Sequence, residues 1–222
     1  LVAERTEGVT SLEGGYEDDL VLRAHAAMEE LAGRRLPTRF RLVKRIPAGA
    51  GLGGGSSDAA TTLRMLITLH RLDVDEGRDL PSLALLLGAD VPFLLRGGAA
   101  DATGLGEALR PAPLATGWYA LAWPGFEVAT GAVYAAWDQV GGAGQNELER
   151  AAGLVEPRLA LAAAALRERE GGWRMTGSGS AFFCHTRTRG AAERALNAIA
   201  DLGFPWRAVT RPVGPWRDGG TG

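Results

Sequence analysis

The sequence predicts an α+β fold divided into two domains. In the first half of the chain, helical apolar spacings alternate with a strand pattern, and glycines and prolines then interrupt every periodicity between residues 97 and 117. In the second half, strand patterns at 118–123 and 173–185 are flanked by helical patterns, which is typical of an antiparallel sheet with helices packed against it. We therefore predict two domains, residues 1–113 and residues 114–222.

The first domain is expected to contain three helices and one well-marked strand. An apolar spacing over 20–31 follows two aspartates and predicts a helix of about three turns that ends at Gly33. Residues 40–46 read as a strand that stops at a proline. Residues 56–58 are expected to cap a second helix, and a third short helix is expected over 81–87.

The second domain is expected to begin with the strand 118–123. Four helical patterns follow, with the strand–turn–strand segment 173–185 before the last of them; they lie near residues 131–140, 147–153, 157–169 and 191–202. The tail after Pro212 is rich in Gly, Pro and Arg, and we expect it to be loose.

Composition and charge limit the class of protein. The chain has 222 residues, 46% hydrophobic and 23% charged, with a formal net charge of −2. This balance gives no sign of the clustered basic face that binds nucleic acid, and no apolar run reaches the roughly 18 residues of a membrane helix. Cys184 is the single cysteine, so an internal disulfide is excluded, and we expect it to be a buried apolar residue. A cytoplasmic protein without nucleic-acid or membrane partners is therefore expected.

A glycine-rich segment, residues 46–60, carries the main functional signal. Glycines allow positive φ angles and let backbone N–H groups approach a phosphate, and a helix that starts there adds partial positive charge. The segment also contains the G-x-G-x-x-G spacing of dinucleotide-binding folds, but the acidic residues expected downstream fall in a polar turn rather than at the end of a strand. A P-loop is excluded because no lysine follows the glycines, and a flexible linker fits poorly between a strand and a capped helix. A phosphate loop of another kind is the favoured interpretation.

Three more motifs, together with this segment, carry a resemblance. Residues 51–60 read Gly-Leu-Gly-Gly-Gly-Ser-Ser-Asp-Ala-Ala, residues 87–93 read Leu-Gly-Ala-Asp-Val-Pro-Phe, and residues 175–183 read Met-Thr-Gly-Ser-Gly-Ser-Ala-Phe-Phe. Residues 146–149 are similar to an Asn-Asp-Leu-Glu motif, with Glu147 where Asp is usual. By these motifs the chain resembles the GHMP kinases, and within them the branch that acts on a cytidine diphosphate-linked methylerythritol.

The resemblance implies a fold, a reaction and a nucleotide site. The fold is the two-domain GHMP kinase architecture, a ribosomal protein S5 domain 2-like N-terminal domain followed by a ferredoxin-like C-terminal domain. The reaction is ATP-dependent phosphorylation, with Mg²⁺, of the 2-hydroxyl of 4-diphosphocytidyl-2-C-methyl-D-erythritol in the non-mevalonate isoprenoid precursor pathway. ATP is expected to contact the glycine-rich loop: Pro47, Ala48, Gly49, Ala50, Gly51, Leu52, Gly53, Gly54, Gly55, Ser56 and Ser57.

The resemblance also assigns chemical roles outside the loop. Asp90 is the implied general base for the substrate hydroxyl, and the apolar residues after it are expected to raise its pKa. Thr130, Gly177, Ser178 and Gly179 are expected on the substrate or phosphate side. Thr130 reads equally well as a plain helix N-cap, and the glycine-serine turn as a simple link between two strands. None of the three histidines has a partner at metal-ligand spacing, so no protein metal site is expected.

The resemblance covers about residues 19–210 and does not reach the front of the family's catalytic domain. A strand with a catalytic lysine and a Gly-Tyr-His motif are expected there and are not recognisable. Lys44, the single lysine, stands on the strand before the glycine loop and cannot replace that lysine by position. Asp19 stands where the family usually has Asn, which puts a nucleotide contact there in question. We therefore expect an incomplete first domain with an exposed sheet edge, and weak or absent turnover.

Two other functions stay open at this point. Another GHMP kinase, acting on a different alcohol, would share the glycine loop, although the Gly-Ala-Asp-Val-Pro string argues against it. A non-catalytic nucleotide-binding module would bind ATP without turnover. In each case the partner is a small molecule, and the chain is expected to be a monomer or a homodimer.

Overall fold

The computed structural model describes residues 1–16 and 18–216. These residues form two compact units. Unit 1 contains residues 1–45, 53–114 and 213–216, and unit 2 contains residues 46–52 and 115–212. The chain therefore crosses between the units four times, and the second crossing falls inside the glycine-rich loop, between Leu52 and Gly53.

Unit 1 is built on a three-stranded sheet in the order β1-β3-β2. The central strand β3 (Thr38–Arg41) is antiparallel to β1 (Val2–Arg5) and parallel to β2 (Ser11–Glu13). Strand β3 is shorter than predicted, since it ends at Arg41. Strands β1 and β2 were not predicted, because neither has a fully buried side chain and the alternating apolar signal is therefore weak.

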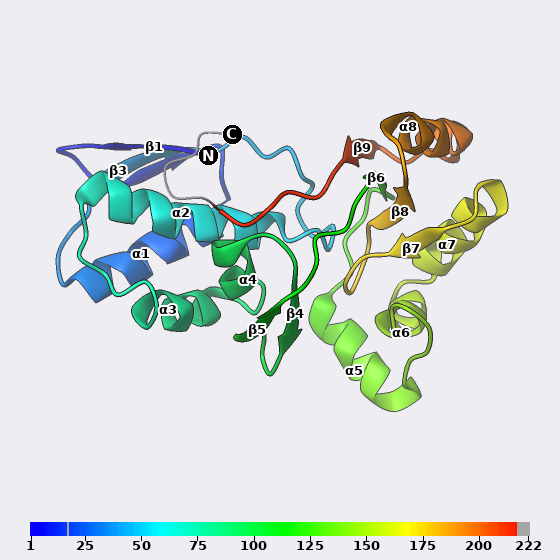
Figure 1. The fold of residues 1–222 in the computed structure, drawn as a ribbon, viewed down its shortest axis with the longest axis horizontal. Coiled ribbons are helices and arrows are strands. Elements are labelled where there is room, and N and C mark those ends of the chain that lie inside the picture. The colour runs from blue at the N-terminus through cyan, green and yellow to red at the C-terminus, as the bar shows by residue number, and fades with distance from the viewer. Residues whose placement is uncertain (17, 217–222) are drawn as a thin grey trace. The chain divides into compact units, whose positions relative to one another are not determined.

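Four helices and a hairpin complete unit 1. Helices α1 (Leu20–Ala32) and α2 (Gly54–His70) lie on one face of the sheet, and α3 (Asp79–Leu87) and α4 (Val91–Arg96) follow on their far side (Figure 1). The hairpin pairs β4 (Ala100–Thr103) with β5 (Ala108–Pro111). The prediction for α1 is confirmed, including its end at Gly33 in the left-handed conformation. The predicted cap of α2 is wrong: Gly53 holds that position, and residues 56–58 lie inside the helix.

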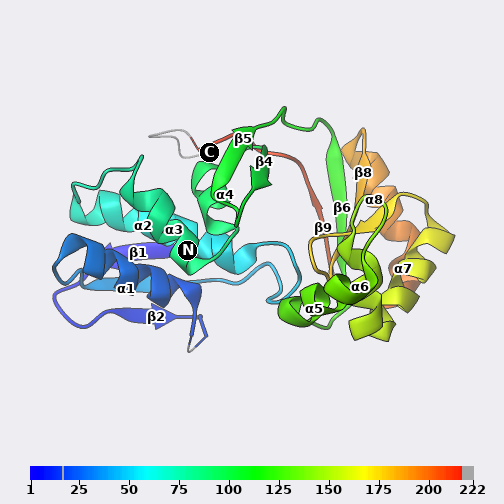
Figure 2. The ribbon, with the colours of Figure 1, turned by 90° about the horizontal axis from the view of Figure 1, so that it is seen from below.

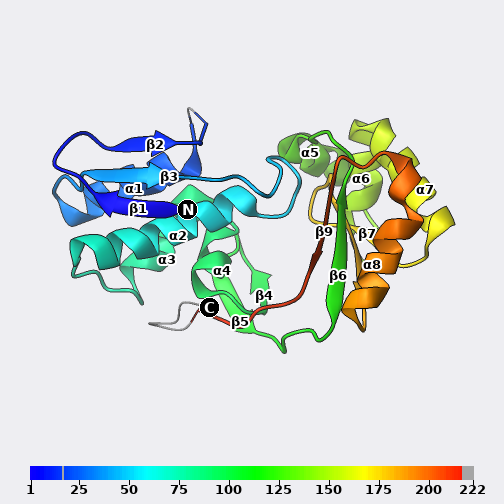
Figure 3. The same ribbon diagram turned by 90° about the horizontal axis from the view of Figure 1, so that it is seen from above.

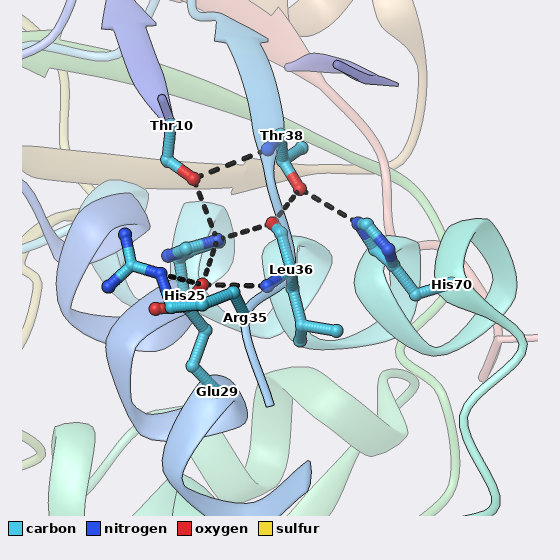
Figure 4. Close-up of polar contacts among 7 residues, drawn as sticks. All are labelled: Thr10, His25, Glu29, Arg35, Leu36, Thr38 and His70. Carbon is cyan, nitrogen blue, oxygen red and sulfur yellow. Dashed lines mark hydrogen bonds and ion pairs between the residues drawn. The ribbon is translucent and has the colours of Figure 1, made fainter. Parts of the chain in front are cut away.

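A buried polar network joins helices α1 and α2 to strand β3 (Figure 4). The carbonyl oxygen of Leu36 accepts hydrogen bonds from His25 Nε2 at 2.8 Å and from the Thr38 hydroxyl at 2.7 Å. The Thr38 hydroxyl thereby uses its only proton, so the His70 Nε2 that lies 2.9 Å away must donate to it. His70 Nδ1 is then an acceptor, and it is buried without a partner among the described residues.

The surroundings of His70 disfavour its charged form. Burial lowers the pKa of His70, and the positive charges of Arg5 and Arg34 lower it further, as does His25. Glu29 acts in the opposite direction. The neutral imidazole is therefore the form that the core of unit 1 accommodates.

Unit 2 contains a four-stranded antiparallel sheet in the order β7-β8-β6-β9. The strands are β6 (Trp118–Trp123), β7 (Trp173–Met175), β8 (Phe182–Thr186) and β9 (Trp206–Thr210). Helices α7 (Pro157–Arg169) and α8 (Arg189–Ala198) cover one face of the sheet (Figure 2, Figure 3). Helices α5 (Thr130–Val140) and α6 (Leu148–Val155) and a short 3₁₀ turn, Ala200–Leu202, complete the unit.

The apolar core of unit 2 joins the sheet to its helices. Trp173 and Phe182 of the sheet are fully buried with Leu159 and Leu166 of α7. Cys184 is buried beside them, as predicted, and burial raises the pKa of its thiol. Among the described helices, none combines the length and the apolar character needed to cross a bilayer.

The beginning of the C-terminal tail is fixed, which corrects the expectation of a loose segment after Pro212. Pro215 forms a β-bridge with Gly97, and the backbone N–H of Trp216 donates to the carbonyl oxygen of Arg96 at 3.1 Å. The composition of the tail did not indicate this anchoring. The groups that form it are a proline and a backbone N–H, which a segment rich in Gly, Pro and Arg would contain whether or not it was held in place. The remainder of the predicted tail lies outside the described residues.

Candidate functional site

The start of helix α2 is open and forms a candidate anion site within unit 1. Its N-cap, Gly53, has φ of +69° and supplies no capping side chain, and the first turn holds no acidic residue. The first N–H groups of a helix have no partner inside the helix, so those of Gly54, Gly55 and Ser56 are available to a ligand. The hydroxyl groups of Ser56 and Ser57 form no hydrogen bond with the described residues. Backbone dipole and free donors together suit a phosphate group.

The first part of the loop, residues 46–52, is bound to a turn of unit 2. The carbonyl oxygen of Ala50 accepts from the N–H of Ala181 at 2.9 Å, and that of Gly51 accepts from the Thr176 hydroxyl at 3.0 Å. Gly51 has φ of +70°, and a Cβ built on it would lie 2.3 Å from the carbonyl oxygen of Gly179. Glycine is therefore required at position 51 both by conformation and by space.

The predicted residues of unit 2 are brought together around the same turn. The Thr130 hydroxyl lies 3.0 Å from that of Ser178. Asn146 Nδ2 donates to the carbonyl oxygens of Met175 and Gly177, each at 2.9 Å. Thr130 is the first residue of α5 rather than its N-cap, which is Ala129. Asn146 was noticed in the sequence only as part of a motif, and the structure shows it as a brace for the turn.

Asp90 stands at the N-terminus of α4, immediately after helix α3. Its neighbours Val91 and Pro92 are buried, but Asp90 itself is exposed. The expected apolar surroundings of Asp90 are therefore wrong, because the apolar side chains after it turn into the core while the helix cap faces outward.

Helix α4 connects Asp90 to the start of α2. The side chain of Leu94 approaches Gly53, with its Cδ1 3.6 Å from a Cβ built there. Asp90 precedes Leu94 by four residues, so both lie on the same face of α4, one turn apart. The carboxylate of Asp90 is thus carried on the helix face that meets the beginning of α2.

An ion cluster beside the loop was missed by sequence reasoning. Lys44 Nζ lies 2.7 Å from Asp58 Oδ2 and 3.2 Å from Asp19 Oδ2, and 5.8 Å from the centroid of the Tyr16 ring. Asp19 is buried and also caps α1 by accepting from the N–H of Val21 at 3.0 Å. Burial acts to lower the pKa of Lys44, but the bonds to Asp58 and Asp19 outweigh it and the pKa is raised. The cluster therefore ties the segment after β3 to the starts of α1 and α2.

The described residues contain no cluster of side chains that would bind a metal ion without help from a ligand. Among the described residues there is no group of three or more His, Cys, Asp or Glu side chains that could hold an ion. Magnesium in kinases is held largely by phosphate oxygens and waters, with one or two protein ligands. The free hydroxyls of Ser56 and Ser57, at the open start of α2, fit such a shared coordination.

Comparison with known proteins gives two family matches. Residues 19–107 match the GHMP kinases N terminal domain, and residues 133–203 match the GHMP kinases C terminal family. Among solved structures, one of a 4-(cytidine 5'-diphospho)-2C-methyl-D-erythritol kinase superposes with a TM-score of 0.79 at 35% identity, covering 96% of this chain and 85% of that one. A homoserine kinase from Cytophaga hutchinsonii, at 17% identity and a TM-score of 0.64, shares the fold. The predicted two-domain α+β GHMP architecture is confirmed.

Curated relatives agree with these matches. A 4-diphosphocytidyl-2-C-methyl-D-erythritol kinase from Aromatoleum aromaticum is 37% identical over 215 residues, which cover 90% of this chain and 75% of the relative. One from Thiobacillus denitrificans is 38% identical over 216 residues, which cover 90% of this chain and 77% of the relative. The chain therefore belongs to the 4-diphosphocytidyl-2-C-methyl-D-erythritol kinases of the GHMP kinase superfamily.

Proposed function

We propose that this chain transfers the γ-phosphoryl group of ATP to the 2-hydroxyl of 4-diphosphocytidyl-2-C-methyl-D-erythritol, with Asp90 as general base. Membership of the kinase family supports the reaction class and the substrate. The observation that carries the assignment of residues is the path from Asp90 through Leu94 to Gly53. This path supports the assignment, because Asp90 stands at the start of the helix whose Leu94 approaches Gly53, the N-cap of the helix that we propose to bind phosphate.

The chemistry follows from this arrangement. The hydroxyl oxygen of the substrate attacks the γ-phosphorus, the bond to the β–γ bridging oxygen breaks, and ADP leaves. Asp90 takes the hydroxyl proton as the new O–P bond forms. The free N–H groups at the start of α2 stabilise negative charge on the phosphate oxygens. Asp90 needs no burial for this task, because its exposed position leaves it accessible to a substrate hydroxyl.

Magnesium belongs to the proposal as a partner of the nucleotide. It neutralises charge on the phosphate oxygens when it is bound. Ser56 and Ser57 are the residues that would hold it on the protein side, since their hydroxyls are free and lie at the open end of α2. Asp58 is committed to Lys44 and is a poorer choice.

The unit 2 residues are proposed to act on the substrate or phosphate side. Thr130 and Ser178 present two hydroxyls that lie 3.0 Å apart, and Gly177 and Gly179 both have positive φ angles. Asn146 holds the carbonyl group of Gly177 in place. We further propose that the enzyme is cytoplasmic and is a monomer or a homodimer.

The proposal is tested by ADP release from ATP, magnesium and the diphosphocytidyl substrate. Asp90→Asn should lower kcat by about 10²–10⁴-fold, because the base is lost while the shape is kept. Asp101→Asn, an exposed aspartate on β4, is the matched control and should retain wild-type turnover. Affinity for ATP should be unchanged in both variants. Retained turnover in Asp90→Asn would remove Asp90 from the chemistry, whereas ATP binding without ADP release by the wild-type chain would favour a nucleotide-binding module.

A further inference from the structure

Helix α4 is too short to maintain itself. It has six residues, and isolated helices of that length do not persist in water. The last carbonyl groups of any helix also lack partners inside the helix. Groups outside the helix must therefore hold the C-terminal end of α4. The position of that end determines the direction of the helix axis, and so the orientation of Val91, the first residue of α4, which follows Asp90.

Three carbonyl groups at the end of α4 are held from outside the helix. The indole Nε1 of Trp216 donates to the carbonyl oxygen of Leu94 at 2.8 Å. The backbone N–H of Trp216 donates to that of Arg96 at 3.1 Å. Between them, Arg64 donates to the carbonyl oxygen of Leu95 from Nε at 3.0 Å and from Nη2 at 2.6 Å. A residue of the C-terminal segment and a residue of α2 thus complete the last turn of α4.

The chain after α4 leaves room for this docking. Gly97 and Gly98 both have positive φ angles. A Cβ at Gly97 would lie 3.0 Å from Cδ1 of Trp216, and a Cβ at Gly98 would lie 3.2 Å from Cδ of Pro215. The two glycines therefore fit the approach of the tail, which is also paired with Gly97 by a β-bridge. A segment that lay against α4 by chance would not require this fit.

Arg64 links the docked segment to the phosphate-binding helix. Its guanidinium lies 5.7 Å from the centroid of the Trp216 ring, a cation–π distance, while it holds the carbonyl oxygen of Leu95. Arg64 is a residue of α2, whose first turn is the open anion site. One side chain therefore connects the helix that carries the phosphate-binding N–H groups, the helix that follows Asp90, and the C-terminal segment.

We infer that Trp216 and Arg64 are positioning residues for the kinase reaction: together they lock α4 onto α2 and so fix Asp90 relative to the phosphate-binding start of α2. The inference rests on the proposed role of Asp90. Trp216 is half-exposed, so its contribution comes from two hydrogen bonds and one stacking contact rather than from burial of the ring. A tail that looks dispensable by composition then controls turnover.

The test compares two tryptophan-to-phenylalanine variants. Trp216→Phe keeps a ring and the backbone N–H but removes the indole donor to Leu94. Trp137→Phe is the matched control, because Trp137 Nε1 has no hydrogen-bond partner among the described residues. Arg64→Met removes the second anchor. Hydrogen–deuterium exchange of residues 91–98 and steady-state kinetics are measured for all three and for the wild type.

Exchange in residues 91–98 should be faster by roughly tenfold in Trp216→Phe and Arg64→Met, and unchanged in Trp137→Phe. In the same two variants kcat should fall by at least about tenfold while KM for ATP stays within about twofold, because misplacement of a reacting group costs turnover rather than nucleotide binding. In an Asp90→Asn background, Trp216→Phe should cause no further loss, since a base that is absent cannot be misplaced.

Several results overturn the inference. Unchanged exchange in both variants would show that the anchors do not hold α4. Faster exchange with wild-type kcat, or losses that add fully to those of Asp90→Asn, would show that they do not act through Asp90. Full activity in Asp90→Asn alone would instead contradict the proposed base, while the exchange measurement would still decide the docking of the tail. If the wild-type chain shows no turnover, exchange alone decides, and unchanged exchange rejects the lock.

Discussion

Helices α1 and α2 of unit 1 begin in opposite ways. At α1, the Asp19 carboxylate accepts a hydrogen bond from the N–H of Val21 at 3.0 Å, and Lys44 balances its charge. At α2, the cap is Gly53, with no side chain to offer and no acidic residue in the first turn. The first helix end is closed by the protein's own carboxylate, and the second is left without a cap from any side chain.

The contrast extends to the whole described chain. Of the described helices with eight or more residues, α2 and α5 alone have neither a capping side-chain hydrogen bond nor an acidic residue in the first turn. Among these longer helices, they are the two whose starts carry predicted site residues, Ser56 at α2 and Thr130 at α5. An open helix start thus coincides with the proposed functional segment of each unit, whereas the start of α1 is closed by its own carboxylate.

The largest expected effect concerns the glycine backbone that leads into α2. Gly51→Ala should lower the free energy of unfolding by about 3 kcal/mol or more, because the new Cβ would meet the carbonyl oxygen of Gly179 in addition to straining the backbone. Gly33→Ala is the matched control, with a similar positive φ but no atom within 4 Å, and should cost only about 1 kcal/mol. Chemical denaturation followed by circular dichroism measures both. Equal losses would show that space at position 51 is not limiting.

A smaller effect is expected at the capped start of α1. Asp19→Ala should lower the free energy of unfolding by about 2 kcal/mol, since it removes the cap and one of two carboxylates that hold Lys44. Asp19→Asn retains a capping oxygen and should lose about half as much. Thermal and chemical denaturation of the two variants separate the cap from the ion pair. Equal stability of both variants and the wild type would show that neither the Asp19 cap nor its ion pair with Lys44 stabilises the folded protein.

The smallest expected effect is the pH dependence of the core between α1 and α2. The pKa of His70 is lowered in the folded state, so its contribution to stability is present above the unfolded pKa of about 6.5 and is lost as pH falls below it. Between pH 7 and pH 5 the wild type should lose more of its free energy of unfolding than His70→Gln, because only the wild type must protonate or bury this imidazole. His185→Gln, which removes an exposed histidine of unit 2, is measured as the control. Identical pH profiles for all three proteins would contradict the neutral, buried imidazole.

The elements predicted well from sequence are those that bury a periodic face. Helix α7 and strand β6 were predicted with their bounds, because helix and strand periodicities are local properties of their side chains. Strands β1 and β2 were missed, since their pairing to β3 is set by distant residues and leaves little apolar pattern. These two strands are defined by their pairing with β3, which a short window of sequence does not contain.

The residues of the candidate site also divide into those that the sequence identified and those that it did not. The glycine loop, Asp90 and the turn around Ser178 were singled out by residue type and motif. The Lys44 cluster and the Trp216 docking were not, because each joins residues more than a dozen positions apart. The apolar surroundings expected of Asp90 failed for a related reason: a sequence string does not show which side of a helix cap faces solvent.

The most direct test of the open start of α2 is ATP binding to Ser56→Asp by isothermal titration calorimetry. The new carboxylate would occupy the first turn, where it favours the helix dipole and should leave the stability of the free protein unchanged or raise it by about 0.3–1 kcal/mol. It would also repel phosphate, so ATP should bind at least about tenfold more weakly, whereas Ser56→Ala should bind within about threefold of wild type. Wild-type affinity in a stably folded Ser56→Asp variant would contradict the account that α2 receives the phosphates of ATP.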